Sequence, residues 1–247
     1  MYKENFYRRE LKFLISYSTY LSLADTLQPF MKADSFGTDG KYKISSLYFD
    51  SNDDKIYWET SNKLPIRQKL RLRVYNSASI HGTAFFEVKQ KVNNWVHKRR
   101  TVLTLAEGYR WMEKWSENDV QAEHFNSSNI QVAKEIQYFQ RAYGLEPKVI
   151  VEYDRHAMEG IYDEDLRVTF DGYLRCRGGS LRLEQEEPFD YFVSTDFVIM
   201  EVKASRSVPL WLSRMLSEFR CLTKGVSKYC TSVNQIRGET KQNGLYS

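Results

Sequence analysis

Charged and apolar residues alternate in the segment KLRLRVYN, which occupies positions 69–76. Lys69, Arg71 and Arg73 stand at every second position, and side chains two residues apart lie on the same face of a β-strand. An arginine guanidinium presents a planar fork of donors that fits two phosphate oxygens at once. The segment therefore predicts a strand with one aliphatic face and one cationic face, and the cationic face is suited to an anion if it lines an interior.

A second pattern places a glutamate two residues before a lysine on three separate segments. The pairs are Glu10 with Lys12, Glu87 with Lys89, and Glu201 with Lys203. On a strand each pair occupies one face, with the two side chains roughly 6–7 Å apart. Many cations with a few carboxylates are the groups that a polyphosphate chain and a divalent metal require, because cations neutralise phosphate and carboxylates hold the metal.

Alternation of this kind predicts a largely antiparallel β-protein with helical insertions. The predicted strands are 8–15, 45–50, 69–75, 85–91, 97–105, 149–155, 166–177 and 197–204. Helical spacing predicts helices over 18–31, 106–115, 129–143 and 208–222, with Ser128 as an N-cap and Gly144 as a stop. The apolar stripes of these helices predict core packing.

Two architectures satisfy the strand pattern. In a sheet packed against helices, the apolar faces form the core and the charged faces meet water, which is the commoner arrangement. In a wide barrel wrapped by helices, the apolar faces pack outward and the charged faces line a lumen. The repeated glutamate–lysine pairs and the strand arginines favour the barrel.

The amino-acid composition limits the number of domains and the classes of protein to which the chain can belong. The chain has 247 residues, 42% of them hydrophobic, without a Pro/Gly/Ser-rich linker or a repeat, which predicts one domain. A net charge of +4 does not by itself predict nucleic-acid binding. Three cysteines without C-x-x-C spacing argue against a disulfide framework or a structural zinc site. The polar start and the absence of a long apolar run predict a cytoplasmic protein whose membrane contact, if any, comes through a membrane-protein partner in another chain.

Nine short motifs together resemble the VTC-type polyphosphate polymerase domain of the triphosphate tunnel (CYTH-like) superfamily, over nearly the whole chain. They are RRELKF (8–13), YFD (48–50), KLRLRVY (69–75), FFEVKQK (85–91), HKRR (97–100), EYDR (152–155), RVTFD (167–171), MEVKAS (200–205) and SKY (227–229). The resemblance implies an α+β fold, an antiparallel β-barrel tunnel of about eight strands wrapped by helices. We expect the tunnel domain over 1–237 and a flexible C-terminal tail over 238–247.

The resemblance also implies a metal-dependent phosphotransferase that moves the γ-phosphate of ATP to a growing inorganic polyphosphate chain. It assigns catalytic roles to Lys12, Arg71, Arg73, Lys89, Arg155 and Lys228. It assigns substrate binding to Lys98, Arg100, Tyr153, Arg167 and Lys203. Glu201 is the implied ligand of Mn²⁺ or Mg²⁺.

Two positions depart from the family pattern. Arg8 stands where hydrolytic relatives have the first glutamate of E-x-E-x-K, which resembles the polymerase branch. Gly225 stands where the polymerase pattern has a second lysine, with Lys224 one residue away. A tripolyphosphate or nucleoside-triphosphate hydrolase and a non-catalytic polyphosphate-binding module remain alternatives. We expect no nucleic-acid binding, because the residues between the strand cations are aliphatic rather than aromatic.

Overall fold

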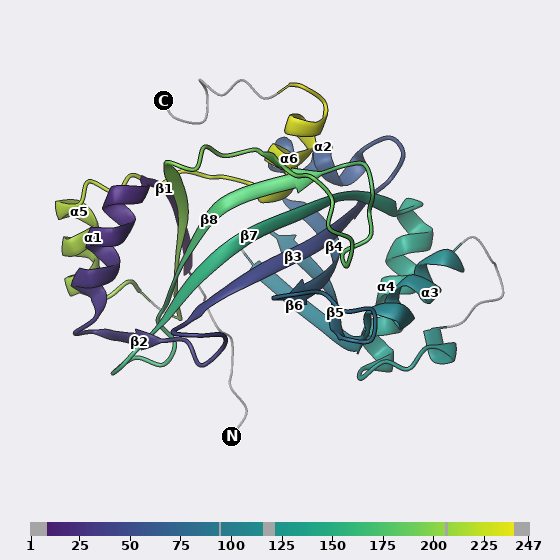
Figure 1. Ribbon diagram of the computed structural model, residues 1–247, viewed down its shortest axis with the longest axis horizontal. Coiled ribbons are helices and arrows are strands. Elements are labelled where there is room, and N and C mark those ends of the chain that lie inside the picture. The colour runs from purple at the N-terminus through teal and green to yellow at the C-terminus, as the bar shows by residue number, and fades with distance from the viewer. Residues whose placement is uncertain (1–8, 94, 116–121, 206, 240–247) are drawn as a thin grey trace.

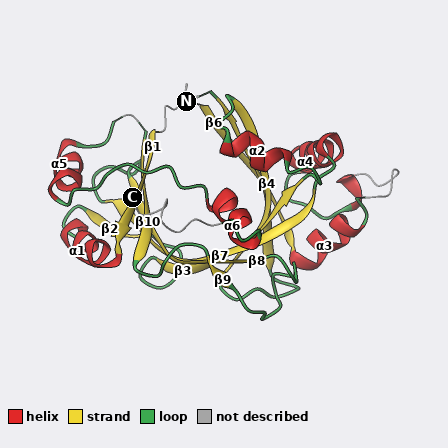
Figure 2. Cartoon of the chain, turned by 90° about the horizontal axis from the view of Figure 1, so that it is seen from above, coloured by secondary structure: helices red, strands yellow, loops and turns green. Residues whose placement is uncertain are grey.

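Ten antiparallel β-strands form one strongly curved sheet in a computed structural model that describes residues 9–93, 95–115, 122–205 and 207–239 (Figures 1 and 2). The strands are β1 (Arg9–Ser16), β2 (Met31–Ala33), β3 (Lys41–Asp50), β4 (Ile66–Tyr75), β5 (Thr83–Val92), β6 (Trp95–Thr104), β7 (Glu146–Gly160), β8 (Arg167–Arg177), β9 (Asp190–Tyr191) and β10 (Phe197–Ala204). All eight predicted strands are present, and the short strands β2 and β9 were not predicted.

The curved sheet has the shape of an open tunnel. Its strand order is β1-β10-β8-β7-β3-β4-β5-β6, with β2 and β9 paired at the sides. Among the described residues no backbone ladder joins the edge strands β1 and β6, so the sheet is not a closed barrel. Lys89 of β5 spans this gap with its ammonium 3.5 Å from the Glu10 carboxylate of β1. The predicted α+β tunnel fold is confirmed, with a side-chain contact where a closed barrel would have a ladder.

The described part of the chain has six helices, and the last of them lies on the concave side of the sheet (Figure 2). They are α1 (Tyr17–Leu27), α2 (Lys55–Ser61), α3 (Leu105–Glu113), α4 (Ile130–Tyr143), α5 (Leu210–Glu218) and α6 (Lys228–Ile236), with a short 3-10 turn at Ala122–His124. Figure 2 shows α1 and α5 outside β1 and β10, and α3 and α4 on the opposite flank. Two apolar cores result, one containing Phe13, Leu23 and Leu212 and the other containing Leu72 and Ile136.

Strand β4 shows how the sequence sets the two faces of the sheet. Leu70, Leu72 and Val74 are at most 2% exposed. Leu72 lies against Gly108 of α3, where an added Cβ would come within 3.2 Å of the leucine methyl. The aliphatic face therefore packs outward on a helix, and the alternate side chains, Arg71 and Arg73, lie on the concave face. The predicted orientation of this strand is confirmed.

Several predicted element ends were wrong. The first helix ends at Leu27 rather than residue 31, since Pro29 has no backbone N–H with which to continue the helical hydrogen bonds. The side chain of Asn129 caps α4, while Ser128 accepts a hydrogen bond from the backbone of Val102 instead. Helix α5 is shorter than predicted, and α2 and α6 were not predicted.

Arg8 and residues 240–247 lie outside the described residues, so the departure at Arg8 and the C-terminal tail stay predictions.

Candidate functional site on the concave face

The concave face brings together all twelve residues to which the sequence analysis assigned a catalytic, substrate-binding or metal-binding role. Strands β1, β4, β5, β6, β7, β8 and β10 each contribute, and α6 adds Lys228. The residues are Lys12, Arg71, Arg73, Lys89, Lys98, Arg100, Tyr153, Arg155, Arg167, Glu201, Lys203 and Lys228. Far-apart segments of the chain thus supply one surface on which cations outnumber carboxylates.

The Glu87 cluster consists of Glu87, Arg71, Arg73 and Lys98. Glu87 is 1% exposed, and its Oε2 atom lies 2.7 Å from both Nε and Nη2 of Arg71. Arg73 Nε lies 3.7 Å from the same oxygen, and Lys98 forms an ion pair with Oε1. Burial alone would raise the pKa of Glu87, but these three cations outweigh burial and hold its pKa well below the usual range. Glu87 is therefore a buried carboxylate anion that holds three cations at the lumen.

Hydroxyl groups from β3 and β7 fix the two arginines. Arg71 Nη1 donates to the Tyr48 hydroxyl at 3.2 Å. Arg73 donates to Ser46 Oγ at 3.1 Å and to the Tyr153 hydroxyl at 3.4 Å. Burial would raise the pKa of Tyr48, yet Arg71 and Arg73 lower it to about 8. The arginine forks are thus oriented before any ligand arrives, which reduces the ordering cost of binding.

The Glu201 cluster lies across the lumen and consists of Glu201, Asp171, Lys12, Lys203, Arg155 and Lys228. Glu201 accepts ion pairs from Lys12 at 3.0 Å and from Lys203 at 3.4 Å. Lys228 Nζ lies 3.5 Å from Glu201 and 2.7 Å from the fully buried Asp171. Burial would raise the pKa of Glu201, but Lys228, Lys12 and Lys203 hold it well below its usual range.

Arg155 completes the Glu201 cluster from β7. Its Nε and Nη2 atoms donate to the two carboxylate oxygens of Asp171 at 2.7 and 2.8 Å. The Tyr153 ring lies beneath both cations, with its centroid 5.4 Å from the Arg155 guanidinium and 4.9 Å from Lys228 Nζ. Tyr153 therefore touches the Glu201 cluster through its ring and the Glu87 cluster through its hydroxyl, and it links the two clusters.

Helix α6 places Lys228 at one end of the tunnel. Ser227 caps the helix by accepting from the backbone of Cys230, and it also accepts from Lys69 Nζ at 3.1 Å. The buried Asp50 carboxylate accepts the backbone amides of Ile56 and Tyr57 and the hydroxyl of Tyr229. One carboxylate thus ties α6 to β3 and to the start of α2.

The three glutamate–lysine pairs behave differently. Lys12 lies 3.3 Å from Glu10 and Lys203 lies 3.4 Å from Glu201, as their spacing predicts. Glu87 instead binds Arg71, which stands directly opposite it on β4, and Lys89 reaches across the gap to Glu10. Spacing along one strand therefore predicts the shared face but not the partner, which depends on strand register.

Arg167 lies at the margin of the site. It shares the concave face with Asp171, but it forms ion pairs with Asp34 and with Glu159, the latter at 3.6 Å. Glu10, Lys69 and Glu87 were noted in the sequence without an assigned role, and each stands two positions from an assigned cation. Ser46, Tyr48 and Asp171 also shape the site, and none of them has a predicted cation at that spacing.

The Glu201 cluster offers part of a donor set for a divalent cation. Within the described residues, no group of three or more His, Cys, Asp or Glu side chains could hold a metal without other ligands. The Thr169 hydroxyl, on the strand position opposite Glu201, is buried and has no hydrogen-bond partner there. Mg²⁺ is commonly held by one or two carboxylates together with phosphate oxygens. Glu201 and Thr169 fit such a partial donor set.

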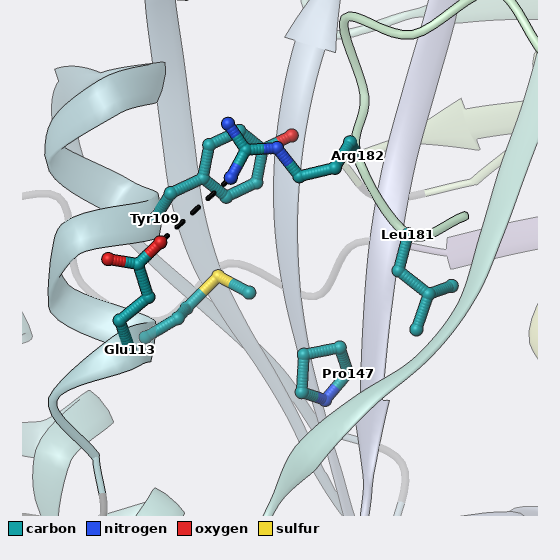
Figure 3. A pocket seen from close by; sticks show the side chains of 6 residues that line it. Tyr109, Glu113, Pro147, Leu181 and Arg182 are labelled. Atoms are coloured by element: carbon teal, nitrogen blue, oxygen red, sulfur yellow. Dashed lines mark ion pairs between the residues drawn. The ribbon is translucent and has the colours of Figure 1, made fainter.

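A separate cavity of about 290 Å³ lies on the outer side, between α3 and the loop that follows β8 (Figure 3). Arg182 stacks on the Tyr109 ring at 3.9 Å and lies 4.0 Å from the Glu113 carboxylate. The remaining lining includes Met112, Pro147 and Leu181. This cavity contains none of the predicted site residues and is lined mainly by apolar groups, so it is a poor site for a polyanion.

Comparisons with known proteins give a matching family and solved structures with a similar fold. The family model described as the VTC domain matches residues 7–237, whereas a comparison with curated proteins gives no match. A candidate adenylyl cyclase from Hippeastrum, described as having a dominant triphosphatase activity, is 16% identical, with 92% of this chain and 95% of that chain covered and a TM-score of 0.55.

A second solved structure has the same fold. A candidate adenylate cyclase from Bacillus halodurans is 14% identical, with 96% of each chain covered and a TM-score of 0.51. Identities this low show a shared fold alone. In the described part of the chain, none of the helices is long and apolar enough to cross a membrane.

Proposed function

Because the chain belongs to the VTC domain family, we propose that it is a polyphosphate polymerase that transfers the γ-phosphate of ATP to a growing polyphosphate chain. The proposal rests on the convergence of positively charged side chains on the concave face. Lysines and arginines from β1, β4, β5, β6, β7, β10 and α6 converge there, held by a few buried carboxylates. A polyphosphate chain can take over the cations that these carboxylates now share.

Phosphoryl transfer depends mainly on positioning and on stabilising the charge that develops, so no protein nucleophile is required. In this proposal Arg71, Arg73, Lys12 and Lys228 grip the triphosphate. Lys89, Lys98, Arg100 and Arg155 stabilise the transferred charge and guide the acceptor chain, with Tyr153, Arg167 and Lys203 as further contacts. A terminal phosphate oxygen of the acceptor attacks the γ-phosphorus in line, and ADP leaves.

Glu201 is the proposed protein ligand for Mn²⁺ or Mg²⁺, with Thr169 beside it. A bound divalent cation would neutralise phosphate charge that the side chains leave uncompensated. Lys12, Lys203 and Lys228 hold the Glu201 carboxylate in the free protein, and they are the groups expected to turn toward phosphate when the cation takes their place.

A triphosphatase is the second candidate. The Hippeastrum protein of the same fold is described as having a dominant triphosphatase activity, and the cationic face suits that reaction equally well. Gly225 supports this alternative, because the polymerase pattern has a lysine at that position, whereas here the position has no side chain. Water would then replace the polyphosphate acceptor.

The reaction product distinguishes a polyphosphate polymerase from a triphosphatase. Purified protein is incubated with ATP and Mn²⁺ or Mg²⁺, and the products are resolved on a polyphosphate gel alongside an orthophosphate assay. Long chains support the polymerase, and orthophosphate alone supports the hydrolase. Salt-sensitive binding without turnover would contradict both enzymes and leave a polyphosphate-binding module.

Matched variants tie the activity to the concave face. Arg73→Gln and Glu201→Gln are expected to lower kcat/KM at least about 100-fold, the scale on which single transition-state contacts act. Arg100→Gln is expected to weaken turnover, whereas Arg99→Gln is the control, because Arg99 is its neighbour on β6 but pairs with Glu135 of α4 outside the lumen. Equal activity of Arg73→Gln and Arg99→Gln would exclude the assigned site.

A further inference from the structure

Four aromatic side chains gather on the concave face at the end of the tunnel away from α6. This aromatic mouth consists of Phe36, Tyr42, Tyr75 and Phe85. Tyr75 follows Arg71 and Arg73 on the same face of β4, and Phe85 precedes Glu87 on the same face of β5. Lys69, at the α6 end, is six residues from Tyr75, or roughly 20 Å along the strand. The cationic path therefore ends at aromatic rings.

The rings of the aromatic mouth form one connected group. The Phe36 centroid lies 4.9 Å from Tyr42 and 4.9 Å from Tyr75, and Tyr75 lies 5.4 Å from Phe85. The contacts to Phe36 and between Tyr75 and Phe85 are edge-to-face. Tyr42 is buried, but Phe36 is exposed and Tyr75 and Phe85 are half-buried, so these three rings keep surface for a planar ligand, because an edge-to-face pair covers only part of one ring face.

Arginines join the aromatic mouth to the phosphate-binding path. The Arg73 guanidinium lies 5.9 Å from the Tyr75 centroid and the Arg100 guanidinium lies 5.1 Å from the Phe85 centroid. Among the described residues, Arg100 has no carboxylate within ion-pair distance. In the described part of the chain, this cation at the mouth therefore has no carboxylate counter-charge, and it lies next to rings that offer stacking surface.

The loop that carries Phe36 is held in place. Asp34 accepts the backbone amide of Phe36 at 3.1 Å and forms an ion pair with Arg167. Gly37 has a φ of +78°, and a Cβ there would meet the Lys41 carbonyl oxygen at 2.3 Å, so the turn requires glycine. Phe36 is nevertheless 44% exposed, which leaves an ordered aromatic side chain facing solvent at the lumen entrance.

We propose that the aromatic mouth stacks the base of a nucleoside triphosphate whose phosphates extend along Arg73 and Arg71. The inference rests on the proposed function and adds the direction in which the nucleotide lies. A nucleotide has a planar, polarisable base at one end and a polyanion at the other, and the concave face has aromatic rings followed by cations in that order. The α6 end, with Lys69, is then left to the polyphosphate chain.

The test compares two ligands that differ in the base. Titration calorimetry measures the affinity of a non-hydrolysable ATP analogue and of tripolyphosphate, without metal, for the wild type, Phe36→Ala and Tyr138→Ala. Stacking on one aromatic ring accounts for roughly 5- to 150-fold in affinity. Phe36→Ala is expected to lower the affinity for the ATP analogue at least fivefold. The affinity for tripolyphosphate should stay within twofold of the wild-type value. Tyr138, 75% exposed on α4, controls for loss of a surface aromatic.

A conservative variant adds a direct optical readout. In Phe36→Trp, the introduced indole is expected to restore analogue affinity and to be quenched by the ATP analogue but not by tripolyphosphate. Unchanged analogue affinity in Phe36→Ala, or an equal loss for both ligands, would overturn the stacking site. Wild-type binding of tripolyphosphate alone would overturn the stacking site while leaving a phosphate function intact. Binding of neither ligand would overturn both proposals.

Discussion

At the scale of single residues, the site depends on buried carboxylates as much as on the cations. Glu87 and Asp171 are at most 1% exposed, and each is surrounded by cations from other strands or from α6. Without these carboxylates, the cations would repel one another in a partly dehydrated lumen. A polyphosphate ligand can replace the carboxylates as the counter-charge, so stability and ligand binding are coupled at these residues.

Glu87→Gln tests this coupling. Removing one partner from a buried ion pair costs about 3–5 kcal/mol, so the melting temperature of the variant should fall. Tripolyphosphate should raise the melting temperature of Glu87→Gln more than that of the wild type, because the anion replaces the lost charge. Glu135→Gln is the control, because its pair with Arg99 is partly exposed on the outer face and such pairs contribute about 0–1 kcal/mol. Equal losses in the two variants would contradict the coupling.

Lys69 is expected to make anion binding dependent on pH. Burial lowers its pKa to about 8, so its ammonium loses its proton above pH 8 in the free protein. A bound phosphate favours the charged ammonium, and binding above pH 8 therefore requires proton uptake. The wild-type affinity for tripolyphosphate should fall about tenfold more between pH 8 and pH 9.5 than the affinity of Lys69→Met. Parallel pH profiles by calorimetry would rule out Lys69 as a phosphate contact.

Residue patterns predicted the cationic face but not its internal pairing. Arg71 and Glu87 meet because β4 and β5 pair in a particular register, and no spacing within either strand reports that register. The aromatic mouth was missed for a related reason. Aliphatic residues lie between the strand cations, but the same-face neighbour of Arg73 is Tyr75, two positions along the strand.

At the scale of elements, long strands and amphipathic helices were predictable, and the two short helices that hold the site together were not. Helix α6 spans nine residues, and its placement depends on Tyr229 donating to Asp50, far away in the chain. Helix α2 begins where the same carboxylate accepts two backbone amides. Helices this short are marginal in isolation, so their stability comes from tertiary contacts that local sequence does not report.

Tyr229→Phe tests the anchoring of α6. The Tyr229 side chain is 1% exposed, and a hydrogen bond to a charged group contributes about 1.5–3 kcal/mol. Its removal should lower the free energy of unfolding by about that amount. Backbone amides of α6 should also exchange hydrogen faster, while those of β3 stay protected. Tyr138→Phe on the exposed face of α4 should change neither quantity. Unaltered exchange in α6 would show that other contacts hold Lys228 in place.

At the scale of the whole molecule, the open sheet and α6 define a lumen with two unlike ends. One end has Lys69 and Lys228 beside α6, and the other has the aromatic mouth. The edges β1 and β6 remain apart, joined in the described residues by the contact between Lys89 and Glu10 rather than by a ladder. Antiparallel architecture was predictable from alternation, whereas the open edge results from the curvature of the whole sheet.

A crystal structure with tripolyphosphate and Mn²⁺ tests the central claim most directly, namely that the concave face binds the phosphates. We expect phosphate oxygens within hydrogen-bond distance of Arg71, Arg73 and Lys228, with the cation beside Glu201. The Glu201 carboxylate should then have released at least one of its three lysines. Phosphate bound outside the lumen, or a lumen that keeps all its ion pairs at saturating ligand, would contradict the account.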